Sequence, residues 1–412
     1  MTPDEGKKQR ALSHLRIIDL GWVWSGPMVS QFLADLGAEV IKIEHTKRLD
    51  SSRLRGKVIK DWKKDVEVSP YFHDLNRNKL SINLNLSCPQ GLELFGNLVR
   101  ISHGLVQNFS PGVPAKLGID YESLRKVRPD LVYLAMPTAG LSGPLKDIIG
   151  YAPVYTSLGG IESLVGYSDG TVTGMIMIGP GDPNAAIQGA LAMLAALYHH
   201  ERTGEGQFIE LSQIEAITHL QGEAVAEYAM NGRVMGPQGN QHRRMAPHGI
   251  YPSSGQDQWV SIAVDSEETW RAFCELMGDS GLADDERFSR SELRLEHRAV
   301  LDDIVSNWTR QYSKHDLTTR LQAAGVAAAP VLSRQEKFSD PQLKARHDFV
   351  KVMHPVLGEE LLNANPWRLS ATPPEIFRPA PLVGEHNDYV YGELLNMSSA
   401  EITRLKEQEV IF

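Results

Sequence analysis

Apolar runs and amphipathic stretches alternate along the first part of the chain. Residues 15–20 form a short apolar run, residues 27–36 carry apolar side chains at helical spacing, and residues 39–44 alternate polar with apolar side chains. Strict alternation is typical of a strand, and repeats at i, i+3 and i+4 are typical of a helix. The succession continues over residues 80–86, 89–101, 105–106 and 131–136. This order predicts an α/β fold with a doubly wound, Rossmann-like parallel sheet.

The pattern changes after residue 216. A loop rich in Gly, Arg and His covers residues 232–251, and strand-like and helical segments follow it at 259–264, 267–277, 298–322 and 326–332. This mixture predicts a second, smaller α+β domain. We therefore divide the chain into the first part of a large domain at 1–211, a linker helix at 212–231, a small domain at 232–332 and a return segment that completes the large domain at 333–412.

Composition and charge argue against several functional classes. The 412 residues carry a formal net charge of −9 and no long basic run, which argues against a nucleic-acid partner. No stretch of about 20 uninterrupted apolar residues occurs, so we expect no membrane span. The polar N-terminus lacks the core of a secretory signal, and the two cysteines, Cys88 and Cys274, lie far apart. These features predict a cytoplasmic protein.

Metal and redox cofactors are not expected either. The chain has no His-Glu-x-x-His motif, no pair of Cys-x-x-Cys motifs and no clustered acidic ligand set. The Gly-x-Gly-x-x-Gly fingerprint is missing after the first predicted strand, which argues against a dehydrogenase despite the α/β pattern.

One short segment carries candidate chemistry. Gly181, Asp182 and Pro183 precede a run of small and apolar residues, which predicts a helix with Asp182 at the N-cap and Pro183 at its first position. Glycine in front leaves room for another molecule to approach the backbone. A carboxylate beside unpaired amides stays ionised and accessible. Asp182 is therefore a candidate nucleophile, and a purely capping role is the alternative.

Further motifs, in this order and spacing, resemble the class III CoA-transferase family. That family includes formyl-CoA transferase, carnitine CoA-transferase and the 2-methylacyl-CoA racemases. The motifs are Ser25-Gly26-Pro27, Leu33-Ala34-Asp35-Leu36-Gly37-Ala38-Glu39, Asn76-Arg77-Asn78-Lys79-Leu80-Ser81, Asn108-Phe109-Ser110-Pro111-Gly112, Leu117-Gly118, Arg202-Thr203-Gly204-Glu205-Gly206-Gln207, Ser212-Gln213-Ile214-Glu215-Ala216 and Gly384-Glu385-His386-Asn387.

The resemblance implies an interlocked homodimer in which each chain forms an open ring around its partner. It implies a coenzyme A thioester as co-substrate and Asp182 as the nucleophile, which forms a mixed anhydride with the acyl group. The residues that it places against CoA are Val23, Ser25, Lys79, Asn108, Lys116 and Leu117. Lys42 and Arg77 are either helpers at this site or solvated surface charges. His45 stands where some relatives have arginine.

Departures from the family pattern narrow the chemistry. Ala152 stands where the racemases have an aspartate and formyl-CoA transferase has a glutamate, and alanine cannot move a proton. The region of the racemase histidine reads Met136-Pro137-Thr138. The four-glycine loop of formyl-CoA transferase corresponds to residues 236–241, which hold only two glycines. Arg243 and Arg244 are candidates to clamp a second carboxylate, or are solvated surface charges.

An aromatic set (Trp22, Trp24, Tyr151 and Tyr155, with Met136) is a candidate lining for the acyl pocket, or ordinary core. We predict a CoA-transferase that moves CoA between organic acids through an aspartyl anhydride and thioester. The alternatives are a non-catalytic CoA-binding subunit that completes a heteromer with an active paralogue, and a 2-methylacyl-CoA racemase.

Overall fold

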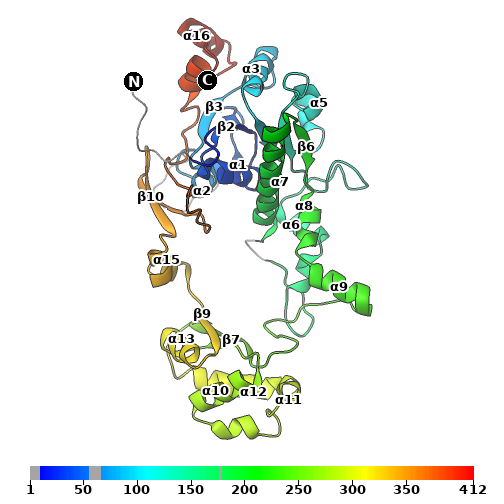
Figure 1. Cartoon of the computed structure of the whole chain (residues 1–412), viewed down its shortest axis with the longest axis vertical. Helices are drawn as coiled ribbons and strands as arrows, with labels where there is room; N and C mark the ends of the chain where they lie inside the picture. Colours follow the sequence, from blue (N-terminus) through cyan, green and yellow to red (C-terminus); the bar gives the residue numbers. More distant parts are fainter. Residues whose placement is uncertain (1–9, 55–65, 176–178) are drawn as a thin grey trace. The chain divides into compact units, whose positions relative to one another are not determined.

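The computed structural model describes residues 10–54, 66–175 and 179–412, and Figure 1 shows the whole chain. Two compact units divide it. The large unit comprises Met1–Ile161, Met177–Gly222 and Gln342–Phe412, and the small unit comprises Glu162–Ile176 and Glu223–Pro341. The chain therefore enters the large unit three times.

Six parallel strands form the sheet of the large unit, in the order β3-β2-β1-β4-β5-β6. Their bounds are Arg16–Asp19 (β1), Glu39–Glu44 (β2), Leu80–Asn83 (β3), Gly104–Gln107 (β4), Val132–Ala135 (β5) and Gln207–Glu210 (β6). Strand order runs outward from β1 in both directions, as in a doubly wound sheet. The predicted α/β fold is confirmed.

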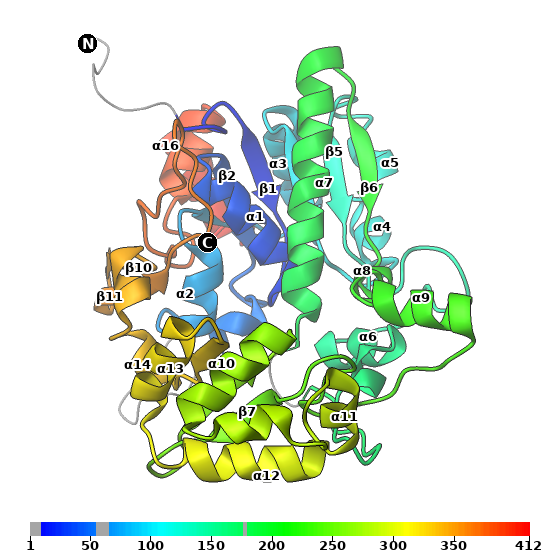
Figure 2. The same ribbon diagram turned by 60° about the horizontal axis from the view of Figure 1, so that its bottom comes forward.

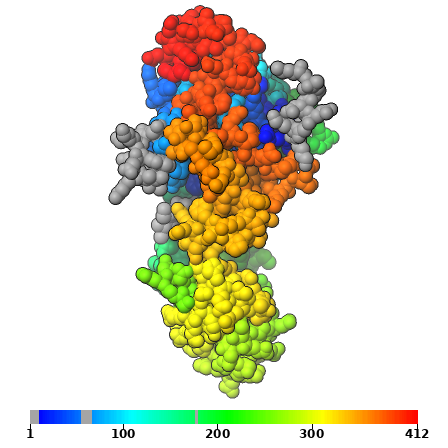
Figure 3. Space-filling model, turned by 90° about the vertical axis from the view of Figure 1, so that its left-hand side faces the viewer, coloured from blue at the N-terminus to red at the C-terminus, as the bar shows by residue number. Residues whose placement is uncertain are grey.

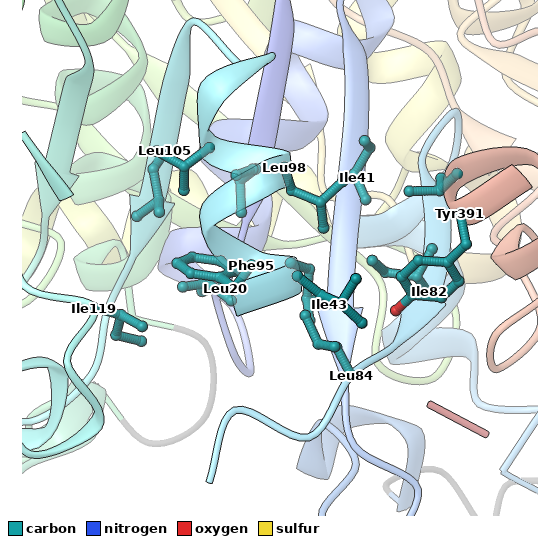
Figure 4. Packing of buried hydrophobic residues seen from close by; sticks show 14 of the residues in the cluster. Leu20, Ile41, Ile43, Ile82, Leu84, Phe95, Leu98, Leu105, Ile119 and Tyr391 are labelled. Atoms are coloured by element: carbon teal, nitrogen blue, oxygen red, sulfur yellow. The ribbon is translucent and has the colours of Figure 1, made fainter. Parts of the chain in front are cut away.

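Both faces of this sheet are covered, because alternate residues of a strand point to opposite sides. Ile17 packs in one apolar cluster with α1 (Ser25–Asp35) and α7 (Gly181–Thr203), which lie side by side in Figure 2. Ile18 packs in the other cluster, with α3 (Pro89–Arg100). Figure 4 shows Phe95 and Leu98 of α3 among Leu20, Ile41, Ile43, Leu105 and other side chains of that second cluster.

Shorter elements complete the large unit. They are η1 (Ser51–Leu54), α2 (Pro70–Asn76), α4 (Val113–Leu117), α5 (Tyr121–Leu124), α6 (Ala152–Leu158), η2 (Ile161–Leu164, at the boundary between the units) and α8 (Gln213–His219). The third passage of the chain adds α15 (Pro341–Ala345), the hairpin β10 (Phe349–His354) and β11 (Gly358–Asn363), the π-helical segment η4 (Asp388–Leu394) and α16 (Ser399–Glu407). In Figure 3 this passage, orange to red, lies over blue N-terminal elements.

Three antiparallel strands and four main helices build the small unit. The strands are β7 (His248–Pro252), β8 (Trp259–Ala263) and β9 (Ala327–Pro330), and the helices are α10 (Glu267–Met277), α11 (Ser291–Glu296), α12 (Arg298–Thr309) and α13 (Lys314–Ala323). Buried Trp270, Phe273 and Leu317 belong to its separate core. Helix α9 (Gly222–Asn231), the short η3 (Ser280–Asp284) and α14 (Arg334–Lys337) also belong to this unit. None of the helices described is long and apolar enough to cross a bilayer.

Two predicted helices are each divided in the structure. The segment predicted at 298–322 forms α12 and α13, because the side chain of Ser313 accepts the amide of Asp316 and so begins a new helix. The segment predicted as one linker helix at 212–231 forms α8 and α9 (Gly222–Asn231). The boundary between the two units falls at the start of α9.

Candidate active site

The β1–α1 turn (residues 20–24) lies at the point where the strand order of the sheet reverses. The neighbours of β1 are β2 and β4, so the connections from these strands leave in opposite directions. In doubly wound sheets ligands bind outside the carboxyl ends of the strands at this point. The structure brings Val23 and Ser25, after β1, together with Asn108, after β4.

Asn108 holds the turn by three hydrogen bonds. Its side-chain oxygen accepts the amide of Trp22 at 2.8 Å, and its amide nitrogen donates to the Trp22 carbonyl at 2.9 Å and to the Ser25 hydroxyl at 3.2 Å. Ser25 is only 1% exposed. These two side chains, which the family resemblance places against CoA, therefore shape the turn, and the half-buried Val23 lies beside them on its surface.

Val23 itself is strained. Its φ of 66° lies in the left-handed region, which a β-branched residue rarely adopts. The amide of Val23 donates to Oδ1 of Asp50 at 3.0 Å. Lys42 donates to the carbonyl of Gly21 at 2.8 Å and to Oδ2 of Asp50 at 3.1 Å. Lys42 and Asp50 thus fix both ends of the strained segment from within the protein.

Lys79 does not lie where a phosphate could reach it. Its ammonium group is fully buried and donates to Oδ2 of Asp19 at 2.8 Å, to the Pro27 carbonyl at 2.8 Å and to the Asn76 side chain at 2.9 Å. An ammonium group has three protons, and all three are used. The predicted contact of Lys79 with the CoA nucleotide is therefore wrong. Lys79 supports the β1–α1 turn instead, because the other oxygen of Asp19 accepts the amide of Gly21 at 2.7 Å.

Burial and the neighbouring charges shift the pKa values of Lys79 and Asp19 in opposite directions. Burial lowers the pKa of Lys79 to about 8, although Asp19 opposes the shift. Burial alone would raise the pKa of Asp19, but Lys79 and Lys42 bring that pKa below its usual range. At neutral pH the two groups therefore remain an ion pair.

Lys42 and Arg77 are also internal. Lys42 is fully buried, and Arg77 is 3% exposed and donates to Oδ2 of Asp35 at 2.8 Å. Both predictions for these residues, as helpers at a CoA site or as solvated charges, are wrong. Apolar neighbours in the sequence signal this burial for Lys42, which stands between Ile41 and Ile43 on β2.

Two exposed cations remain near the carboxyl ends of the strands. Lys116 is exposed on α4, and the neighbouring Leu117 packs partly against the core. Arg48, which the sequence analysis missed, is exposed and lies 5.2 Å from the ring centroid of Trp22. Neither cation forms an ion pair within the described ranges. The polar run after β2 was the sequence feature that could have indicated Arg48 as an exposed cation. The His45 ring, in the same run, accepts the amide of Lys47.

Asp182 lies in the first turn of α7 but does not cap it. The helix begins at Gly181 with Pro180 at the N-cap, so the predicted N-cap role of Asp182 is wrong. Pro183 falls at the third position, where a backbone N–H still has no partner within the helix. The half-buried carboxylate remains beside the positive end of the helix dipole.

Tyr155 of α6 packs against the start of α7. A Cβ atom on Gly181 would come within 2.4 Å of Cε2 of Tyr155, so only glycine fits there. Burial raises the pKa of the Tyr155 phenol, and the neighbouring Asp182 carboxylate raises it further. On the opposite side, the side chain of Asn184 donates to the carbonyl of Ala216 at 2.7 Å. These contacts fix the first turn of α7 and with it Asp182.

The other candidate residues are spread over the fold. Trp22 and Trp24 are half-buried in the β1–α1 turn, Tyr151 is 63% exposed before α6, and Met136 is fully buried in the core. Ala152 is the first residue of α6. In the small unit, Arg243 lies 3.4 Å from Glu227, Arg244 is exposed, and Gly239 of the 236–241 loop donates its amide to the carbonyl of Gly166.

An apolar cavity of about 270 Å³ lies beyond the ends of β4 and β5. Phe109, Ala115, Tyr121 and Phe208 contribute to its wall. Two of its polar groups are occupied within the protein, because Gln107 accepts the amide of Phe109 and Tyr133 donates to the carbonyl of Ile119. The cavity offers mainly apolar contact.

Removing the ammonium group of Lys79 should destabilise the whole large unit. We expect Lys79→Met to lower the free energy of unfolding by about 3–5 kcal/mol, because Asp19 is left buried without its partner. Lys116→Met, at an exposed lysine, should change it by less than about 0.5 kcal/mol. Urea denaturation of both variants measures the difference, and equal stabilities would contradict a structural role for Lys79.

Comparison with known proteins identifies the family. The model for CoA-transferase family III matches residues 12–387. The chain is 32% identical to succinyl-CoA–D-citramalate CoA-transferase of Chloroflexus aurantiacus, over 98% of each chain. It is 30% identical to the beta subunit of succinyl-CoA–L-malate CoA-transferase of the same organism, over 97% of this chain and 98% of the other. A crystal structure of a CAIB/BAIF family protein from Brucella suis superposes with a TM-score of 0.85 at 30% identity, over 94% of this chain and 100% of the other.

The match spans both units and all three passages through the large unit. It includes the β1–α1 turn, the ion pair of Asp19 and Lys79 beneath that turn, and the first turn of α7. The chain belongs to CoA-transferase family III and is an enzyme of that family.

Proposed function

We propose that this enzyme transfers coenzyme A from an acyl-CoA to a free carboxylic acid, with Asp182 as the covalent carrier. The observation that carries the proposal is a half-buried carboxylate in the first turn of α7, at the positive end of a helix of 23 residues. A helix N-terminus favours negative charge, and a carboxylate is a competent nucleophile toward a thioester.

The proposed reaction divides the exchange into covalent steps. An oxygen of Asp182 attacks the thioester carbonyl, the carbon–sulfur bond breaks, and the thiolate leaves with the electron pair. The thiolate then attacks Cγ of Asp182 in the resulting mixed anhydride and releases the donor acid as a carboxylate. The acceptor carboxylate repeats these two steps in reverse on the aspartyl thioester. Each step exchanges one acyl bond for another, so no oxidant or metal is required for balance.

For the acids, we propose short dicarboxylates of the succinate class. The support is that both relatives named above carry succinyl-CoA and a second dicarboxylic acid in their names. Racemisation is disfavoured, because Ala152 has no group that can accept a proton.

The free thiols of Cys88 and Cys274 agree with a reducing, cytoplasmic location.

For CoA, we propose binding along the β1–α1 turn and α4. Val23 and the buried Ser25 and Asn108 shape the path of the pantetheine arm, and Leu117 provides an apolar contact. The phosphates require exposed cations, and Lys116 and Arg48 are placed to supply them.

Replacing the carrier should abolish transfer. We expect Asp182→Ala to remove turnover while the protein still folds and binds CoA, because the loss of one negative charge at a helix N-terminus costs only about 0.3–1 kcal/mol. Incubation of the wild type with succinyl-CoA and hydroxylamine should convert Asp182 to a hydroxamate, which mass spectrometry of its peptide detects. Turnover in the variant, or an unmodified peptide during turnover, would contradict the mechanism.

The two exposed cations should matter for CoA affinity. We expect Lys116→Ala and Arg48→Ala each to weaken CoA by roughly ten- to hundred-fold, mainly in the Michaelis constant, because charge-assisted hydrogen bonds contribute about 1.5–3 kcal/mol. Lys344→Ala removes an exposed lysine on α15 and is the matched control. Titration with CoA and with dephospho-CoA distinguishes the phosphates. Unchanged affinity in both variants would refute this placement.

We also propose that the enzyme is a homodimer. One face of α7 exposes large apolar side chains, with Ile187 57%, Leu191 68% and Tyr198 61% exposed. A patch of this kind is typical of a protein interface.

Light scattering should give twice the chain mass, and Leu191→Arg should reduce the dimeric fraction. A single-chain mass for an inactive wild type, with activity only after addition of a paralogue, would favour the alternative of a heteromeric subunit.

A further inference from the structure

The hydroxyl group of Tyr155 is an exception among the buried tyrosines. Four tyrosines are buried in the described part of the chain. Tyr133, Tyr251 and Tyr391 each donate to an oxygen at 3.1, 2.7 and 2.7 Å. Tyr155 is 1% exposed and its hydroxyl makes no hydrogen bond of ordinary geometry with any described residue, and the Asp182 carboxylate is the polar group that acts on it. Leaving a buried hydroxyl unsatisfied destabilises a fold.

The packing of Tyr155 places its ring at the nucleophile. The ring lies against Gly181, where a Cβ atom would be 2.4 Å from Cε2 of Tyr155 and 3.2 Å from Cγ2 of Thr156. Gly181 immediately precedes Asp182, and the phenol interacts electrostatically with its carboxylate. The buried ring therefore packs against the backbone immediately before Asp182.

We propose that the Tyr155 hydroxyl stabilises the negative charge that develops on the carboxyl oxygen of Asp182 during transfer. The proposal rests on the proposed function. When the thiolate of CoA attacks Cγ of acylated Asp182, a carbon–sulfur bond forms and the carbonyl electron pair moves onto the oxygen. Tyr155 donates a hydrogen bond to this oxyanion. Collapse returns the pair, breaks the anhydride bond and releases the donor acid as a carboxylate.

A donor of this kind must keep its proton throughout the reaction. Burial and the charge of Asp182 both raise the pKa of Tyr155, so the phenol keeps its proton more strongly than an exposed tyrosine does. In the buried position it needs no reorganisation of solvent when the charge develops, which is the condition under which oxyanion donors act most strongly. The unsatisfied hydroxyl in the resting protein is then satisfied in the transition state.

The test separates catalysis from stability with two matched variants. Tyr155→Phe removes only the unsatisfied hydroxyl, so we expect an unchanged or higher unfolding temperature and a fall in kcat of roughly 10- to 1000-fold, with little change in KM for succinyl-CoA. Tyr391→Phe removes a buried hydroxyl that donates to the Asn83 carbonyl at 2.7 Å, far from Asp182 in the sequence and in another part of the core. It should lower the unfolding temperature and leave kcat unchanged.

Each outcome distinguishes the two proposals. If the wild type transfers CoA and forms the hydroxamate at Asp182, but Tyr155→Phe retains the wild-type kcat, the role of Tyr155 is overturned and the carrier mechanism stands. If Tyr155→Phe lowers the unfolding temperature or fails to fold, Tyr155 is a structural residue and the inference is overturned as well. If the wild type forms no hydroxamate during turnover, the proposed function itself fails, and this role fails with it.

Discussion

The buried ion pair between Asp19 and Lys79 is the interaction on which the β1–α1 turn, at the carboxyl end of the sheet, depends. Asp19 ends the first strand and binds the amide of Gly21, while Lys79 reaches the carbonyl of Pro27 inside α1. The pair therefore ties the end of β1 to the first turn of the next helix. Buried charges cost desolvation energy, which is recovered only in good geometry, so an alternative conformation of the turn would leave a charge unpaired. The cost of leaving either charge unpaired therefore favours one conformation of the β1–α1 turn.

The second ion pair, between Lys42 and Asp50, extends the same constraint to Val23. The left-handed conformation of this valine is unfavourable on its own and persists only where its surroundings determine it from several sides. Asp50 binds its amide, and Lys42 binds the carbonyl two residues earlier. Buried charge thus maintains a strained backbone at the place where doubly wound sheets bind ligands.

The sequence predicts the large sheet well, because parallel strands buried on both faces give apolar runs and the helices between them have clear periodicity. It does not predict where a long side chain ends. Lys79 stands in a family-like motif, and nothing in that motif shows that its ammonium group turns inward toward Asp19. Local rules also compete. Asp182 is a residue type that suits the N-cap, yet the helix begins one residue before it, at Gly181. Arg48 was missed because its interest comes from the spatial proximity of Trp22.

Two unfavourable features, the backbone of Val23 and the hydroxyl of Tyr155, therefore occur in the parts of the large unit that carry the candidate chemistry. Strain and unsatisfied polar groups of this kind collect at functional sites, where they are maintained by the rest of the fold. The residues that maintain them here are buried and charged or are glycines in close contact, so they tolerate little change. Side chains outside the buried ion pairs can change without disturbing this support. Trp22, Trp24 and the exposed Tyr151 meet that condition, because none of them takes part in the buried ion pairs. Substitution at these three positions is therefore expected to leave both buried ion pairs intact.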